Sequence, residues 1–290
     1  MKICGFSFVR NGVKLEYPFL EAIRSILPLC DEVIVAVGQS TDDTLEQIKS
    51  LGPKITIIET IWEQGLQQGR VLAVETDKAF QAIPAKYDWC IYIQGDEVIH
   101  EKYHPVIRES MQQYLDDKKV EGFLFHYTHF FGSYAYVGVN SRWYRREIRI
   151  VRNNKEIFSY RDAQGFRKKP NDKLRVKLID AYIYHYGWVR KPEAMLEKEK
   201  QKVTLYDGEA AVISGHTELP NEYTYEKDTQ PVKLFTGTHP AVMRERVSGQ
   251  SWTFHPDPNL KYSSMKDRFK RVVGKWTGWF PGEYKNYKII

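Results

Sequence analysis

Short apolar runs alternate with amphipathic stretches through the first hundred residues. The runs are rich in β-branched and aromatic side chains, as buried strands are, and lie at 2–9, 33–37, 55–61 and 88–93. Apolar residues recur at helical spacing in the stretches between them, at 17–29, after 38–44 and at 69–83. This order predicts a parallel sheet that helices cover on both faces.

Polar segments follow three of these strands. Asn11 comes after the first strand, GQSTDDT (38–44) after the second and QGDE (94–97) after the fourth. Parallel sheets of this kind bind ligands beyond the carboxyl ends of their strands. We therefore expect the three segments to converge on one site.

The second half of the chain has a weaker pattern. Strands are predicted at 122–131, 146–153 and 180–189, and a polar helix is predicted at 193–206. Charged and apolar residues alternate at 146–153, which predicts a half-buried strand. Residues 207–260 have no clear periodicity, whereas 263–279 have the pattern of an amphipathic helix.

Charge is concentrated at the end of the chain. The net charge of +6 equals that of residues 261–290, which hold eight Lys or Arg against two acidic residues. The remainder is nearly neutral, which argues against a general nucleic-acid-binding surface. Two interpretations of the basic, aromatic tail remain open: a helix packed on the protein with a solvated basic face, or peripheral contact with an anionic membrane.

The cysteines and the N-terminus indicate a cytoplasmic protein. Cys4, Cys30 and Cys90 lie far apart in apolar stretches, without metal-binding spacing, so we expect buried free thiols. The sequence shows neither a signal-peptide pattern nor an apolar stretch long enough for a transmembrane helix. Any membrane contact is therefore expected to be peripheral, at the inner face.

The motifs resemble those of bacterial family 2 glycosyltransferases, which have the GT-A fold. The resemblance begins with FVRN, DEVIVAVG and STDDT, at 8–11, 31–38 and 40–44. YIQGDE (92–97) then stands where the family places its Asp-x-Asp motif. RWYRREIRIVRN (142–153) and IYHYGWV (183–189) resemble later segments on the acceptor side, so the likeness covers about residues 1–205.

This resemblance implies an α/β fold of the three-layer, Rossmann-like GT-A type, with a mixed, mostly parallel sheet. The catalytic domain would span 1–205 and a helical or irregular extension 206–290. The implied reaction is an inverting transfer of a sugar from a nucleotide-diphosphate sugar to the hydroxyl of a glycan or lipid-linked acceptor, assisted by Mn²⁺ or Mg²⁺. Polysaccharide or lipopolysaccharide synthesis is the expected setting.

The QGDE segment is the expected metal and diphosphate site. A carboxylate at a strand end can hold a divalent cation that neutralises the leaving diphosphate. The resemblance makes Asp96 the main ligand, with Glu97 as a second contributor and His185 as a late ligand. For each there is a structural alternative: an exposed turn carboxylate for Asp96 and Glu97, and a buried core histidine for His185.

Two departures from the family pattern affect the donor site. Gln94 replaces the first Asp of the motif, and a neutral amide binds metal poorly but can hydrogen-bond ribose or diphosphate. Residues 36–39 contain no acid, so recognition of the base is expected from backbone groups, Gln39 or Asp42.

Two further residues are donor-site candidates, each with a structural alternative. Asn11 is either a contact of the base or simply a turn residue. Arg70 either meets phosphate or is a solvated helix charge.

An inverting transfer also needs a general base. Asp162, in the loop SYRDAQGF, best matches the position of the family's acid, and Glu147 is the second candidate. His126 and His129 are predicted to share one face of their strand, either lining the acceptor cleft or packing in an aromatic core.

Two other functions compete with this prediction. A sugar nucleotidyltransferase shares the fold, but FVRNGVK has a single Gly where a triphosphate-binding loop needs several. The other is a non-catalytic protein that binds carbohydrate or a surface through its basic aromatic tail.

Overall fold

The computed structural model describes residues 1–290 except 64, 141, 258–259, 261–272, 274–275 and 277–283. Its centre is a run of four parallel strands in the order β3, β2, β1, β4. These strands span Ile55–Thr60, Glu32–Gly38, Ile3–Val9 and Trp89–Tyr92. All four predicted strands of the first hundred residues are therefore confirmed.

The sheet continues beyond β4 with mixed pairing, in the order β8, β6, β11, β10, β9. These strands are Arg146–Arg152, Gly122–Phe131, Asp172–Trp188, Gly165–Lys168 and Ile157–Tyr160. Strand β8 is antiparallel to both β4 and β6, whereas β6 and β11 are parallel. The α/β, Rossmann-like fold class with a mixed sheet is confirmed.

Helices cover the two faces of this sheet. On one face, α1, α2 and α4 contribute buried apolar side chains to one core cluster, and these helices span Phe19–Ile26, Thr44–Lys49 and His104–Gln113. On the other face, α3 (Arg70–Gln81) packs Ala79 and Phe80 into a second cluster. The layers follow from the sequence, because the central strands are apolar on both sides.

Strand β8 corrects one expectation. Its alternating charges predicted a half-buried strand, but Glu147 and Arg149 are 5% and 1% exposed. The strand lies between β4 and β6, and the Arg149 guanidinium pairs with buried Glu97 at 2.8 Å. A charge that is neutralised within the protein mimics the pattern of a solvent-facing side chain.

The later segments return to the same sheet. The short strand β5 (Glu97–Ile99) and the terminal strand β13 (Tyr287–Ile289) pair with β11, while β12 (Val232–Leu234) pairs with β7 (Ser133–Gly138). Short helices η1, α6, η2 and α7 span Glu101–Tyr103, Glu209–Ile213, Ala241–Met243 and Arg244–Ser248. The domain boundary at 205/206 stays a prediction.

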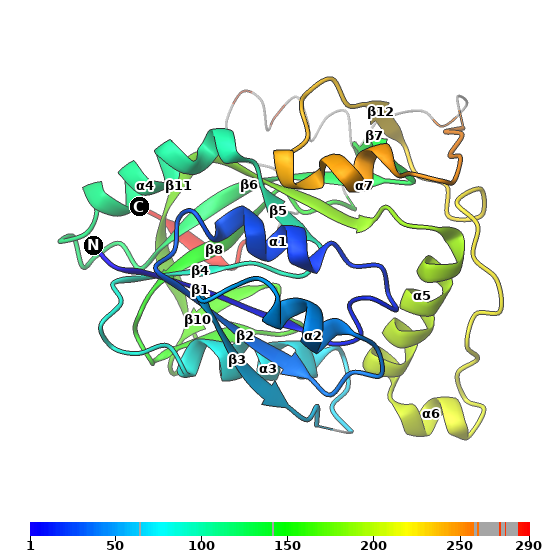
Figure 1. Ribbon diagram of the computed structural model, residues 1–290, viewed down its shortest axis with the longest axis horizontal. Helices are drawn as coiled ribbons and strands as arrows, with labels where there is room; N and C mark the ends of the chain where they lie inside the picture. Colours follow the sequence, from blue (N-terminus) through cyan, green and yellow to red (C-terminus); the bar gives the residue numbers. More distant parts are fainter. Residues whose placement is uncertain (64, 141, 258–259, 261–272, 274–275, 277–283) are drawn as a thin grey trace.

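Helix α5 (Pro192–Asp207) follows β11 and confirms the polar helix predicted at 193–206. Figure 1 shows α5 at the end of the molecule opposite the N-terminus, toward which β1 and β2 run. The amphipathic helix predicted at 263–279 falls mostly outside the described residues. Within the described part, no helix is both long and apolar enough to span a bilayer.

Candidate active site

Two adjoining cavities open at the carboxyl ends of β1 and β4. The Asp96 cavity, of about 260 Å³, lies between the ends of these strands and α5. The Arg70 cavity, of about 980 Å³, lies between α3 and the β9–β10 region. Gln94, Asp162 and Tyr206 line both cavities, so these three residues stand at the junction. The sheet edge predicted to bind ligands is the edge that holds the cavities.

The carboxylate of Asp96 is surrounded by basic side chains. Its Oδ2 lies 3.6 Å from His185 Nε2 and 3.8 Å from Lys198 Nζ. Burial alone would raise the pKa of Asp96, but the charges of His185, Lys198 and Arg190 outweigh it and hold the pKa well below its ordinary value. Asp96 is therefore an anion at neutral pH, as a ligand for a metal ion must be.

Helix α5 carries the positive side of this cavity. Lys198 Nζ donates a hydrogen bond of 2.5 Å to Gly187 O. Burial, reinforced by the charge of Arg190, lowers the pKa of Lys198 to about 7, although Asp96 opposes the shift. One face of the helix lines the cavity, because residues three and four apart are neighbours on a helix; that face consists of Lys198, Gln201, Lys202 and Leu205.

His185 stands between Asp96 and a second histidine. Its Nδ1 lies 2.9 Å from His129 Nδ1, and His129 Nε2 lies 2.7 Å from Tyr144 O. Both rings are buried, with His129 4% and His185 8% exposed. Burial and the charge of His185 lower the pKa of His129 well below its ordinary value, so His129 is neutral. His185 is thereby held in contact with Asp96, as the sequence prediction requires.

The prediction that His126 and His129 share one face of their strand is wrong, whereas the aromatic packing that was one of their two expected roles is present. Tyr127 stacks on His129, with ring centroids 5.4 Å apart, while His126 stacks on Tyr182 at 4.9 Å. His129 therefore lies on the side of the strand where Tyr127 lies. Residues three apart in a strand point to opposite faces, which separates His126 from His129.

Glu97 is committed to an ion pair. Arg149 donates to both carboxylate oxygens, each at 2.8 Å, and Tyr127 Oη donates at 2.7 Å. The carboxylate is fully buried. The metal role predicted for Glu97 therefore has no support from its surroundings, whereas a structural role explains them.

Gln94 connects the motif turn to the loop of Asp162. Its Nε2 donates to Tyr92 Oη at 3.2 Å and to Ala163 O at 3.1 Å. The neutral amide thus holds the loop that follows β9 against the end of β4. Its replacement of the family's carboxylate fits this positioning role.

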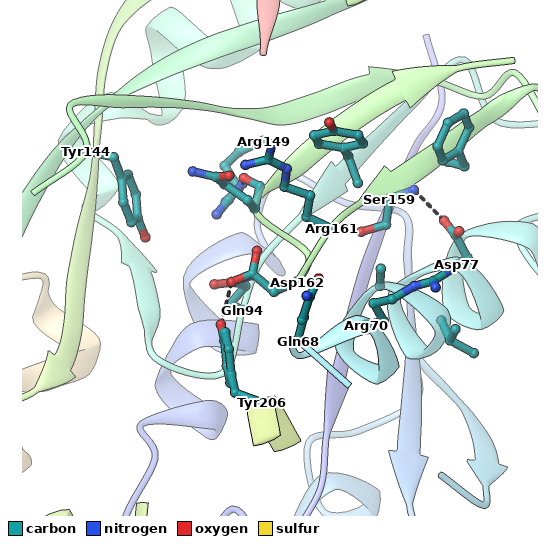
Figure 2. A pocket seen from close by; sticks show the side chains of 15 residues that line it. Gln68, Arg70, Asp77, Gln94, Tyr144, Arg149, Ser159, Arg161, Asp162 and Tyr206 are labelled. Atoms are coloured by element: carbon teal, nitrogen blue, oxygen red, sulfur yellow. Dashed lines mark hydrogen bonds between the residues drawn. The ribbon is translucent and has the colours of Figure 1, made fainter. Parts of the chain in front are cut away.

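Asp162 faces the junction of the two cavities. Tyr206 Oη donates to Asp162 Oδ2 at 2.5 Å (Figure 2). The end of α5 is held there by the start of α3, because Gln68 N donates to Tyr206 O and Gly69 N to Leu205 O, both at 3.0 Å. Tyr206, at the end of α5, thus fixes the carboxylate of Asp162 beside the Asp96 cavity.

Arg70 and Asp77 line the larger cavity from α3. Arg70 is exposed and is the first residue of α3. Asp77 accepts a hydrogen bond of 2.7 Å from Ser159 N, as Figure 2 shows. Burial raises the pKa of Asp77 to about 6, although this hydrogen bond and Lys169 oppose the shift. Arg70 lies outside the Asp96 cavity, so its contact with the donor phosphates stays a prediction.

The turn after β2 forms a separate surface. Gln39 and Asp42 line a cavity of about 510 Å³, apart from Asp96. Asp42 accepts hydrogen bonds from Lys14 N at 2.7 Å and Thr44 N at 3.1 Å, which stabilises the turn. Recognition of the base by Gln39 or Asp42 stays a prediction.

Asn11 ties the end of β1 to this turn. Its Oδ1 accepts from Thr41 N at 2.8 Å, and its N donates to Ser40 Oγ at 3.0 Å. These bonds support the turn interpretation of Asn11. A contact between Asn11 and the base stays a prediction.

Glu147 lies away from these cavities. Its carboxylate packs against Gly165, where a Cβ built on the glycine would lie 3.0 Å from Glu147 Oε2. Glu147 lines neither the Asp96 cavity nor the Arg70 cavity. Of the two acids predicted as a general base, only Asp162 reaches the site.

Three residues of the Asp96 cavity were not predicted from the sequence: Arg10, Trp62 and Lys198. The Arg10 guanidinium lies 5.2 Å from the centre of the Trp62 ring, and both residues line the Asp96 cavity. Trp62 fits there because Gly38 has no side chain; an added Cβ would lie 2.3 Å from Trp62 Nε1. An aromatic face beside an arginine suits a base or a phosphate. The spacing of Lys198 and Lys202 shows that they share one face of α5, but not that this face meets the cavity.

Comparison with known proteins gives one sequence relative. The chain is 24% identical over 215 residues to an uncharacterized glycosyltransferase of Rickettsia typhi, covering 72% of this chain and 67% of that protein. This match supports a glycosyltransferase, the class of enzyme that the motifs indicated. The resemblance to glycosyltransferases is thus confirmed, whereas family 2 stays a prediction, and no family model matches the chain.

Solved structures give weaker matches. S. aureus TarS 1-349 in complex with UDP-GlcNAc is 16% identical, covering 73% of this chain and 69% of TarS, with a TM-score of 0.42. Glucosyl-3-phosphoglycerate synthase from Mycobacterium tuberculosis, in complex with Mn²⁺, UDP and phosphoglyceric acid, is 20% identical, covering 45% and 44%, with a TM-score of 0.31. At these TM-scores the matches carry no argument about function.

Proposed function

We propose that the chain is a glycosyltransferase that moves a sugar from a nucleotide-diphosphate sugar to an acceptor hydroxyl. The carrying observation is that Asp96, Asp162 and Lys198 line one cavity at the carboxyl ends of β1 and β4. This combination supplies a site for a cation, a proton acceptor and a positive group for a leaving diphosphate. The related protein from Rickettsia typhi, which is named a glycosyltransferase, supports the same class of reaction.

The donor diphosphate is placed against the positive side of the Asp96 cavity. Arg10 approaches from the end of β1, and Lys198 and Lys202 approach from α5. Negative charge develops on the diphosphate as the bond to the sugar breaks, and fixed positive groups in a buried site stabilise that charge. The nearby ring of Trp62 offers a flat surface for the base or the ribose.

Mn²⁺ or Mg²⁺ fits beside Asp96. Asp96 Oδ2 and His185 Nε2 face the same small space, which a Cβ on Gly187 would fill, at 2.7 Å from each atom. Among the described residues, no three His, Cys, Asp or Glu side chains come together in a group that could hold a metal ion. Oxygens of the donor diphosphate would therefore complete the coordination of the cation. When bound, the cation neutralises diphosphate charge. The imidazole ligand favours Mn²⁺ over Mg²⁺.

Asp162 is proposed as the general base. The acceptor would reach the junction from the Arg70 cavity and give its hydroxyl proton to the carboxylate of Asp162. The acceptor oxygen forms a bond to the anomeric carbon while the bond from that carbon to the diphosphate oxygen breaks. Attack from the side opposite the leaving group inverts the anomeric configuration. A glycan or a lipid-linked glycan is the proposed acceptor.

A thermal-shift screen tests donor binding directly. A ligand that binds the native state raises the unfolding temperature with its concentration. We expect one nucleoside diphosphate among UDP, GDP, ADP and CDP to raise it, and Mn²⁺ to enlarge the shift. Asp116→Asn, at an exposed acid after α4, is the matched control for Asp96→Asn. Equal shifts in both variants would contradict the placement of the donor at Asp96.

Localisation and membrane contact remain predictions. The chain is expected in the cytoplasm, and a peripheral contact through 261–290 would bring it to lipid-linked acceptors. Most of that segment lies outside the described residues. The contact is measured by the binding of the protein, with and without residues 261–290, to anionic liposomes. Equal binding of the two proteins would contradict a membrane contact through this segment.

A further inference from the structure

The buried pair of His129 and His185 has a hydrogen-bond order that the surroundings determine. His129 Nε2 lies 2.7 Å from Tyr144 O, and a carbonyl oxygen can only accept a hydrogen bond. His129 Nε2 must therefore carry a hydrogen. The two ring nitrogens of His129 contact Tyr144 O and His185 Nδ1, whereas His185 Nε2 faces the carboxylate of Asp96. A positive charge in this pair is therefore favoured on His185, which leaves His129 Nδ1 with a lone pair and no hydrogen.

The second ring follows from the first. His185 Nδ1 lies 2.9 Å from the lone pair of His129 Nδ1, so His185 Nδ1 must donate. His185 Nε2 is then the nitrogen left to face Asp96; it carries a hydrogen while His185 is charged, and it offers a lone pair to a cation once that hydrogen is lost. That Nε2 is the atom 3.6 Å from Asp96 Oδ2. The reverse tautomers would set two acceptors against each other at Tyr144 O, inside the protein, where unmet polar contacts are costly.

We infer that His129 is a positioning residue that fixes the Nδ1–H tautomer of His185, so that His185 Nε2 and Asp96 Oδ2 form a prearranged pair of ligands for a divalent cation. The inference rests on the metal assistance in the proposed function. Histidine ligands in metal sites generally donate their other N–H to a fixed partner, which sets the ring's orientation.

The packing around His129 holds the ring in place. Trp143 stacks on it with centroids 5.1 Å apart, and the Tyr144 ring meets it edge-on at 4.4 Å. A rotation of the His129 ring would break the bond to Tyr144 O and the bond to His185 together. The orientation of His185 is therefore set from β6 and from the Tyr144 segment, not from its own strand alone.

Three variants separate this role from packing. His129→Phe keeps an aromatic ring but removes the acceptor for His185 Nδ1–H. His129→Asn places an amide oxygen near the position of Nδ1 and restores that acceptor. His126→Phe, on the same strand and stacked on Tyr182 instead, is the matched control.

The first readout is the tautomer of His185 in chelator-treated protein, measured by ¹⁵N NMR of the histidine rings. The sample is kept at about pH 8, above the ordinary histidine pKa. We expect Nδ1–H in the wild type, in His129→Asn and in His126→Phe, and a mixture of tautomers in His129→Phe. A wild-type His185 without a hydrogen on Nδ1 would overturn the inference, and so would an unchanged Nδ1–H in His129→Phe.

The second readout is Mn²⁺ binding, measured by electron paramagnetic resonance with inorganic pyrophosphate present. We expect His129→Phe to weaken binding about 10- to 100-fold, with His129→Asn close to the wild type. Equal weakening in His129→Asn and His129→Phe would mean packing alone and would overturn the inference. The tautomer does not depend on turnover, so an inactive protein with the expected tautomer would count against the proposed function and not against this inference.

Discussion

Lys198 Nζ lies 3.8 Å from Asp96 Oδ2, so a positive side chain already stands beside the carboxylate proposed to hold a cation. A divalent cation bound to Asp96 would be repelled by the charge of Lys198. A diphosphate would balance both, because it brings at least two negative charges. We therefore expect Mn²⁺ and the nucleoside diphosphate to bind together more tightly than either binds alone.

Replacing Lys198 tests its role toward the diphosphate. Lys198→Met should lower the affinity for the nucleoside diphosphate about 10-fold or more, because a buried charge-assisted contact is lost. Lys202→Met is the comparison on the same helix face, where the side chain is 47% exposed and pairs with Glu199. Isothermal titration calorimetry measures both. A larger loss in Lys202→Met than in Lys198→Met would contradict the assignment.

Asp162 and Glu147 are the two predicted bases, and their geometry separates them. Asp162→Asn should lower kcat about 10²- to 10⁴-fold, the usual contribution of a general base, with little change in donor affinity. Glu147→Gln should leave kcat nearly unchanged in the folded fraction, since Glu147 lines neither cavity at the site. Transfer rates at saturating donor decide; a loss confined to Glu147→Gln would reverse the assignment.

Gly187 leaves the space between the proposed metal ligands. In Gly187→Ala the added Cβ would lie 2.7 Å from both Asp96 Oδ2 and His185 Nε2. We expect Mn²⁺ binding to fall at least about 10-fold. Circular dichroism checks that the fold is kept. A folded Gly187→Ala protein with unchanged Mn²⁺ affinity would show that the cation lies elsewhere.

Asp77 predicts a pH-dependent stability difference. Burial raises its folded pKa from 3.8 to about 6, so the folded state binds more protons than the unfolded state between these values. The contribution of Asp77 to the free energy of unfolding therefore falls as the pH rises through this window, and it stays low above pH 6. Asp77→Asn should be more stable than the wild type at neutral pH, by up to about 3 kcal/mol.

The difference between Asp77→Asn and the wild type should disappear as the pH falls toward 4. Urea unfolding across this range measures it, with Asp116→Asn as the control at an exposed acid. A constant difference at all pH values would mean that the substitution acts through packing rather than through the charge.

The central strands were predictable because their apolar runs carry the information locally. Strand β1 is buried on both faces, and the run at 2–9 accordingly lacks the alternation of polar and apolar residues that a half-exposed strand shows. Strand β8 was misjudged because Arg149 is neutralised by Glu97, a residue 52 positions away that local pattern cannot reveal. The same pair removed the support for Glu97 as a metal ligand.

The candidate site was predictable only in part. Asp96, His185 and Asp162 each follow a strand or lie near its end, where motif and topology agree. Lys198 was missed because nothing in a polar helix shows which face is buried. Its contact with Asp96 depends on how α5 lies across the strand ends, and tertiary packing decides that.

The most direct test of the central claim is turnover by the wild type and by Asp96→Asn. Release of the nucleoside diphosphate from a panel of nucleotide sugars is measured with Mn²⁺ present, first with water and then with glycan acceptors. We expect the wild type to release the nucleoside diphosphate from one donor. Asp96→Asn should lose this activity, whereas Asp116→Asn should keep it. Equal release by Asp96→Asn and the wild type would contradict the account.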